Sequence, residues 1–331
     1  MVSSGLEGVV VADSHISYVD GQAGRLILRG HSLEQLEPWT FEEMGAMLWQ
    51  RPLTGLGEAR LRVAPWIREL VPLATHLSPI EWLRFALDRL PSGTSIDWVA
   101  ALGVALALRR NPQAQPDPGL GHVEDVARMA GLTGSDGLRR YWVCVAEHGM
   151  NASTFTARVV ASTRAGERAA VSAALGALQG PLHGGAPGPV LDMLEVLESH
   201  PDPAAWFAQQ LRDGQRLMGF GHRIYRVRDP RAEVLRRACQ SLPGLQQKLA
   251  FAEHMETLAT QALSAHKPGR VLQTNVEYYT ALLLDALGLE RSEFTAVFAC
   301  GRVLGWLAHI FEQEAEGRLI RPEVRYVGPM D

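Results

Sequence analysis

Hydrophobic residues along this chain recur mostly at the spacing of an α-helix. Only residues 9–30 alternate in the manner of strands, with β-branched side chains on both sides of Asp20 and Gly21, a dipeptide typical of hairpin turns. Almost every later segment repeats its apolar positions every three or four residues. The pattern therefore predicts an all-α fold that begins with a short N-terminal β-hairpin.

Capping residues indicate where several helices begin. Thr40 precedes an apolar run with two glutamates in its first turn, and Ser78 is followed by proline, which is favoured at the first helical position. Prolines and polar residues between two helical patterns predict a surface loop. The helices expected on these grounds cover residues 41–50, 79–90, 97–110 and 135–148, and the loop covers residues 111–121.

The composition is that of an ordinary globular protein. The 331 residues can bury a sizeable core in one large or two smaller domains, and 47% of them are hydrophobic against 21% charged. A net charge of −4 and a pI near 6.3 give no general affinity for nucleic acid or anionic membranes. The most apolar run, residues 98–108, is too short to span a bilayer.

Cysteine usage and the N-terminus favour a cytoplasmic location. Cys144, Cys239 and Cys300 are odd in number and far apart, so we expect neither a disulfide framework nor a metal-binding pair. Residues 1–14 lack the basic and long apolar stretches of a signal peptide. We therefore expect a soluble, cytoplasmic protein with no nucleic-acid or membrane partner.

Glycine and proline interrupt the helical pattern beside histidines in three places. These breaks lie at residues 147–163, 180–188 and 218–232. A glycine inside a helix costs roughly 0.5–1 kcal/mol relative to alanine, so the breaks predict tight turns or a backbone that closely approaches a ligand. The three segments are the first candidates for a functional site.

His183 precedes two glycines and then Pro187, after which the pattern becomes helical. An imidazole near a helix N-terminus is kept neutral by the partial positive charge there. A neutral histidine can donate a hydrogen bond to an oxygen that becomes an enolate. A capping or core histidine is the alternative interpretation of the same residue.

His222 lies in a second glycine turn and is followed by four arginines. An arginine cluster beside such a turn suits anionic ligands, whereas a solvated basic face is the simpler alternative. Asp229 and Pro230 break the chain, so that Arg231 comes from the start of a helix. The arginines in question are Arg223, Arg226, Arg228 and Arg231.

Polar residues occur at two further places where apolar residues dominate. His148 and Asn151 lie where one helix gives way to another, and a capped helix–helix turn explains them as well as a binding site does. Arg302 lies on an apolar helix and needs a partner, because burying an unpaired charge is very costly. A substrate carboxylate or an internal acid would serve equally.

Glu277 stands at the start of a helix beside two tyrosines. Locally it is a first-turn acid favoured by the helix dipole, or else a catalytic base. Metal-binding, nucleotide-binding and serine-hydrolase motifs do not occur in the sequence. The histidines, the arginines and one carboxylate that remain suggest proton transfer on an anionic substrate, without a cofactor or metal.

Seven segments together resemble the citrate synthase family, in the family's order and at both ends of the chain. The likeness is weakest over residues 53–136. It implies a nearly all-helical homodimer, with a large domain of residues 1–185 and 292–331 and a small domain of residues 186–291 that closes over the substrates. The segments are residues 5–30, 147–163, 180–186, 219–232, 274–288, 298–313 and 318–329.

The resemblance also implies a role for each candidate residue. His183 would bond the thioester oxygen of acetyl-CoA, Glu277 would take the methyl proton, and His222 would polarise the carbonyl of oxaloacetate and protonate it. The residues implied to hold oxaloacetate are His148, Arg231, Arg302 and, from the partner subunit, Arg321. Those implied to contact CoA are Arg226, Leu217, Gly219, Gly221 and Asn275.

The sequence departs from the family pattern at three positions. Glu277 replaces the usual aspartate, Ala281 a frequent glycine, and Pro187 the usual asparagine. The extra methylene of Glu277 moves the carboxylate by roughly 1–1.5 Å, a displacement that can cost about 100-fold in rate. Three functions remain open: a citrate synthase, a 2-methylcitrate synthase that uses propionyl-CoA, and a catalytically weak relative that binds oxaloacetate or CoA as a regulatory protein.

Overall fold

The computed structural model describes residues 5, 6, 8–183, 187–269 and 271–330, which form a mainly helical protein. The elements are β1 (Ser17–Asp20), β2 (Arg25–Leu28), β3 (His31–Ser32), α1 (Leu33–Leu36), α2 (Phe41–Trp49), α3 (Leu56–Leu70), η1 (Val71–Leu73), α4 (Pro79–Arg89), α5 (Ser95–Arg110), α6 (His122–Ala130), α7 (Ser135–Val145), α8 (Ala152–Ser162), α9 (Glu167–Leu178), α10 (Pro187–Glu198), α11 (Pro203–Arg212), α12 (Pro230–Gln240), α13 (Gln246–His266), α14 (Val276–Ala286), η2 (Arg291–Glu293) and α15 (Phe294–Glu316).

The predicted N-terminal hairpin is confirmed. Strand β1 pairs antiparallel with β2, with Asp20 opposite Arg25, and the short β3 extends the sheet. Asp20 stabilises the turn, because its Oδ1 accepts hydrogen bonds from the backbone N–H groups of Gln22 at 3.1 Å and Ala23 at 2.8 Å. The Asp–Gly signal therefore marks a real turn.

The capping residues begin the helices where the sequence predicts. Thr40 and Glu43 form a capping box at α2, in which the Thr40 hydroxyl accepts from the Glu43 N–H at 3.1 Å. Ser78 opens α4 in the same way. Helix α5 begins two residues earlier than expected, at Ser95, because Thr94 caps it.

The predicted helix over residues 135–148 is three residues too long. Helix α7 ends at Val145, and Gly149 follows with φ of 65°. The Glu147 carboxylate accepts a hydrogen bond from the Gly149 N–H at 2.5 Å, which fixes a turn in place of another helical turn. His148 is thereby placed in the turn between α7 and α8.

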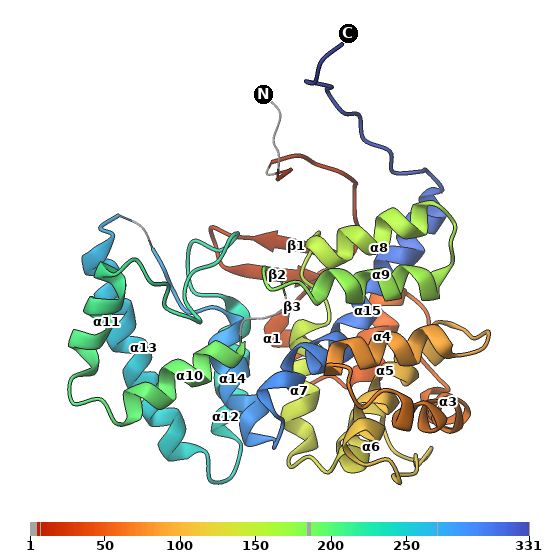
Figure 1. Cartoon of the computed structure of the whole chain (residues 1–331), viewed down its shortest axis with the longest axis horizontal. Coiled ribbons are helices and arrows are strands. Elements are labelled where there is room, and N and C mark those ends of the chain that lie inside the picture. The colour runs from red at the N-terminus through yellow and green to blue at the C-terminus, as the bar shows by residue number, and fades with distance from the viewer. Residues whose placement is uncertain (1–4, 7, 184–186, 270, 331) are drawn as a thin grey trace.

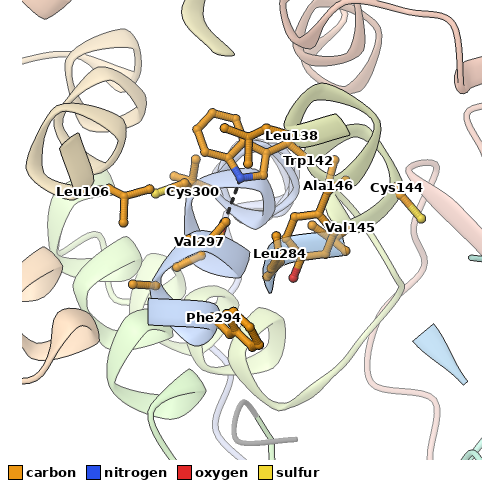
Figure 2. Close-up of a cluster of buried hydrophobic side chains, with 14 of the residues drawn as sticks. Leu106, Leu138, Trp142, Cys144, Val145, Ala146, Leu284, Phe294, Val297 and Cys300 are labelled. Carbon is orange, nitrogen blue, oxygen red and sulfur yellow. Dashed lines mark hydrogen bonds between the residues drawn. The ribbon is translucent and has the colours of Figure 1, made fainter. Parts of the chain in front are cut away.

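Helix α15 forms the centre of the core. Trp142 of α7 packs against it and donates its Nε1–H to the Val297 carbonyl at 2.9 Å (Figure 2). The segment Arg291–Glu316 is long and apolar enough to cross a membrane, but 83% of its apolar window is buried inside the protein, as in the core helix of a globular fold. The three cysteines are free and buried, and burial raises the pKa of each thiol.

The helices gather in two groups. Helices α10 to α14 lie together on one side, whereas α3 to α6, α8, α9 and α15 lie on the other (Figure 1). The two ends of the chain leave the body on the same side, near β1 and α8 (Figure 1). Between the groups, α12 and α14 pack against α7, and the turn after α7 brings His148 to this boundary.

Candidate active site

Three aromatic residues from two distant segments meet at the boundary between the two groups of helices. The Nε2 of His148 lies 3.1 Å from the Tyr225 hydroxyl. The ring of His222 is 5.5 Å from that of His148 and 4.7 Å from that of Tyr225, centroid to centroid. Tyr225 was not among the predicted site residues, although it lies within the glycine-turn segment at 218–232.

The backbone around His222 determines its tautomer. Its Nδ1 accepts hydrogen bonds from the N–H groups of Ile224 at 3.0 Å and Tyr225 at 3.1 Å, so the ring proton lies on Nε2. Burial and the charge of Arg231 lower the pKa of His222 to about 4. His222 is therefore a neutral donor at pH 7, with its Nε2 at 3.4 Å from Nη2 of Arg231.

Arg231 lies in the first turn of α12 and is held by Asp229, the N-cap residue of this helix. Asp229 accepts from Nε of Arg231 at 3.0 Å and from Nη2 at 2.7 Å, a two-pronged ion pair. Burial opposes the charge, but the Asp229 carboxylate raises the pKa of Arg231 above its usual value. The predicted helix start at Asp229 and Pro230 is confirmed, and it fixes a permanent positive charge beside His222.

Arg302 is a second buried guanidinium, on α15. Its Nε donates to the Val145 carbonyl at 2.5 Å, and its guanidinium lies over the Phe298 ring at 4.6 Å. No Asp or Glu in the described part of the chain forms an ion pair with it, although the Glu147 charge favours its ionisation. Burial lowers its pKa to about 10. An internal ion-pair partner, one of the two alternatives expected for Arg302, is thus not found in the part of the chain that the structure describes.

His183 contacts the first turn of α8. Its Nε2 lies 2.8 Å from the Ser153 hydroxyl and accepts from the Ser153 backbone N–H at 3.3 Å. Because a backbone N–H can only donate, the proton of the imidazole lies on Nδ1. Trp306 fixes the same serine by donating to its hydroxyl at 3.1 Å.

Burial and Arg302 lower the pKa of His183 to about 4, so this histidine is neutral at pH 7. The helix N-terminus that it contacts is that of α8, whereas the sequence pattern pointed to the start of α10. Residues 184–186, which connect His183 to α10, lie outside the described residues. They include the glycine pair of the motif and the first residue of the expected small domain.

Glu277 lies in the first turn of α14, where Asn275 caps the helix and accepts from the Glu277 N–H at 3.0 Å. Burial raises the pKa of its carboxyl to about 7, an effect that Arg231 reduces and Asp229 reinforces. The Glu277 side chain is half-buried, so it is not fully solvated as a surface first-turn acid would be. A carboxyl group that ionises near neutral pH is suited to general base catalysis.

The glycine turn at 217–221 pairs with the segment before α14. Gly219 and Gly221 have φ of 84° and 81°, and a Cβ on Gly219 would lie 2.8 Å from the Tyr278 ring. The Gly221 N–H donates to the Gln273 carbonyl at 2.8 Å, and the Asn275 side chain donates to the Gly221 carbonyl at 3.0 Å. Asn275 thus ties this turn to the start of α14, and Leu217 is buried beside it.

The remaining arginines lie in different surroundings. Arg226 is exposed, with its backbone N–H donating to the Gly21 carbonyl at 2.7 Å, and Arg228 forms an ion pair with Glu256. Arg321 is exposed in the C-terminal segment after α15. Among the described residues, no three His, Cys, Asp or Glu side chains are arranged to hold a metal.

Two neutral histidines, one carboxyl with a raised pKa and two buried guanidinium groups are the chemical groups that proton transfer on an anionic substrate needs. The family described as "Citrate synthase, C-terminal domain" matches residues 5–73 and 86–323. The chain therefore belongs to the citrate synthase family and is an acyltransferase-type enzyme. Within the chain, the match is interrupted only at residues 74–85, in the stretch where the resemblance is weakest.

Individual relatives cover nearly the whole chain. The citrate synthase of Haloferax volcanii is 33% identical over 99% of this chain and 96% of its own length. The 2-methylcitrate synthase of Mycobacterium tuberculosis is 31% identical over 99% of this chain and 91% of its own. The crystal structure of citrate synthase from Thermotoga maritima is 34% identical, with a TM-score of 0.86 over 100% of this chain and 97% of that one.

Proposed function

We propose that this protein is a citrate synthase, which condenses acetyl-CoA with oxaloacetate and hydrolyses citryl-CoA to citrate and CoA. The observation that carries the proposal is the half-buried carboxyl of Glu277 in the first turn of α14, whose pKa is raised to about 7. A carboxylate with this pKa is a stronger base than an exposed one, yet half of it is ionised at neutral pH. The identity to named citrate synthases supports the same reaction.

Enolate formation needs a base and a donor that act together. The methyl proton of a thioester is weakly acidic, so Glu277 removes it only if the oxygen of the forming enolate is stabilised. The Nδ1–H of the neutral His183 is our candidate donor, because its Nε2 is held by Ser153. An oriented donor of this kind contributes about 2.7–4 kcal/mol to the transition state.

Oxaloacetate brings two carboxylates and the carbonyl that the enolate attacks. His222 has the proton on Nε2 that the carbonyl oxygen would accept, both as a hydrogen bond and then as the new hydroxyl. We assign the carboxylates to Arg231, Arg302 and His148. Arg302 lacks an acidic partner among the described residues, which supports this assignment.

Assembly and domain closure complete the proposal. We infer a cytoplasmic homodimer in which Arg321 of each chain reaches the site of the partner, since it is exposed after α15. The segment 186–291 would act as the small domain that closes over oxaloacetate. Acyl-CoA would then contact Arg226, Leu217, Gly219, Gly221 and Asn275, with no cofactor required.

A 2-methylcitrate synthase is the second candidate, because a relative of that name is 31% identical over nearly the full chain. The two reactions differ by one methylene in the acyl group. A pocket distinguishes such substrates by only about 1–3 kcal/mol, so the distinction has to be measured.

Release of free thiol with oxaloacetate and either acetyl-CoA or propionyl-CoA tests the proposal. Wild type should turn over acetyl-CoA faster, Glu277→Gln should abolish turnover, and Glu277→Asp should keep or raise it. Faster turnover of propionyl-CoA would select the second candidate. No thiol release with either substrate would leave a binding protein that regulates by holding oxaloacetate or CoA.

A further inference from the structure

Glu256 is a buried carboxylate that the proposed reaction does not use. It lies on α13 with 8% of its surface exposed. Its Oε1 accepts hydrogen bonds from the Thr274 hydroxyl and from Nη1 of Arg228, and its Oε2 accepts from the Tyr279 hydroxyl. Three donors from outside α13 therefore converge on a single side chain.

These donors come from the two segments that carry the candidate base and the main arginine. Arg228 immediately precedes Asp229, and Thr274 immediately precedes the cap of α14. The segments are also joined directly, because the Asp229 N–H donates to the Thr274 carbonyl at 3.1 Å and the Val276 N–H donates to Asp229 at 3.3 Å. Glu256 adds a further link between the same two segments.

The charge of Glu256 matters to each of its partners. Burial opposes the charge of Arg228, but Glu256 raises the pKa of this guanidinium, whose Nε is buried without a partner among the described atoms. Burial and the bond to Glu256 raise the pKa of Tyr279, which therefore remains a donor. A neutral amide at position 256 would offer one acceptor oxygen to three donors and turn its NH₂ group toward the others.

We propose that Glu256 is a positioning residue for catalysis, which holds Glu277 and Arg231 in register by binding Arg228, Thr274 and Tyr279. The inference rests on the proposed function, because it concerns the geometry of that site. Glu256 touches neither substrate in this scheme. Its effect comes from fixing two backbone segments whose side chains perform the reaction.

The variant Glu256→Gln tests this role, and Glu253→Gln is its matched control. Glu253 lies one turn earlier on α13 and pairs at 3.0 Å with Arg236, further along α12, and no hydrogen bond or ion pair among the described residues joins its side chain to residues 228–231 or 274–279. We expect Glu256→Gln to lower kcat by about 10- to 100-fold, as displacements near 1 Å do. Glu253→Gln should change kcat less than twofold.

The pH profile separates positioning from a purely structural effect. Loosened segments would admit water to Glu277, whose burial is the main cause of its raised pKa, so the acid limb of the kcat profile should move to lower pH. Tyr279→Phe removes one donor and should produce a smaller shift in the same direction. This milder variant decides the question if Glu256→Gln does not fold.

Circular dichroism and thermal unfolding establish which variants are folded. Folded Glu256→Gln with the kcat and acid limb of wild type would overturn the positioning role while the proposed function stands. Lower stability with an unchanged acid limb would assign Glu256 to the fold alone. Wild type that releases no thiol would instead reject the proposed function.

Discussion

Asp229 and Arg231 form a buried ion pair across the first turn of α12. The two oxygens of Asp229 accept from Nε at 3.0 Å and from Nη2 at 2.7 Å, and the side chains are 0% and 5% exposed. The pair also influences Glu277, because Asp229 raises the pKa of this carboxyl and Arg231 lowers it. Asp229 therefore both anchors Arg231 and, together with the charge of Arg231, sets the basicity of Glu277.

Removal of the Asp229 charge should both destabilise the protein and weaken oxaloacetate binding. Asp229→Asn leaves the Arg231 guanidinium buried without its counter-charge, which costs about 3–5 kcal/mol. Urea denaturation measures the loss, and the KM for oxaloacetate reports the displaced arginine. Asp136→Asn is the control, because Asp136 is 57% exposed in its pair with Arg139 and should lose only about 0–1 kcal/mol. Equal small losses in the two variants would contradict the importance of the buried pair.

The rate should depend on the ionisation of Glu277. The base acts only when it is deprotonated, so kcat/KM for acetyl-CoA should fall as the pH drops below about 7, the pKa to which burial raises this carboxyl. His183 and His222, with pKa values of about 4, remain neutral over this range. Initial rates between pH 5.5 and pH 9 would show the acid limb. A flat profile down to pH 5.5 would mean that another group is the base.

Local signals in the sequence predicted the parts of the fold that depend on neighbouring residues. The Asp20 turn and the caps at Thr40 and Ser78 are made by side chains that bond within three residues, so their positions follow from the sequence. The end of α7 was missed because the Glu147 side chain takes the Gly149 N–H and interrupts the helix. Competition between side chain and backbone of this kind has no periodic signature.

Contacts between residues far apart in the sequence determine the features of the site that the sequence pattern left open. The first-turn position of Glu277 was predicted, but the charges that shift the pKa of its carboxyl come from Arg231 and Asp229, in another segment of the chain. Whether Arg302 had an internal acid as its partner depended on the packing of α7 against α15. Tyr225 and Glu256 gave no signal, because their importance lies in contacts with His148 and Thr274 far away in the chain.

The raised pKa of Glu277 should lower the free energy of unfolding at neutral and alkaline pH. Its folded-state pKa, about 7, lies above the ordinary value of 4.5, so its stabilising contribution is complete below pH 4.5 and is lost as the pH rises through 7. At pH 8 the penalty is about 3 kcal/mol. Glu277→Gln should therefore raise the free energy of unfolding by about that amount at pH 8, and by less at pH 5. Urea denaturation at both values measures this, with the exposed Glu124→Gln as control. No gain at pH 8 would mean that Glu277 is solvated.

Contact between the N-terminal hairpin and the His222 turn should be needed for activity. The Gly21 carbonyl accepts from the Arg226 N–H at 2.7 Å, and a Cβ on Gly21 would lie 2.3 Å from the Ile224 carbonyl oxygen. Gly21 does not have a positive φ, so Gly21→Ala adds a clash without backbone strain.

Relief of that clash requires the hairpin and the turn to separate, because the atom that Gly21→Ala meets belongs to the backbone. The Ile224 N–H is one of the two donors that orient His222, so the imidazole should move with the turn. We expect kcat/KM for oxaloacetate to fall about 10- to 100-fold. Gln22→Ala, at the next and exposed position, should behave like wild type in the same steady-state assay. Wild-type kinetics in Gly21→Ala would show that the hairpin does not position His222.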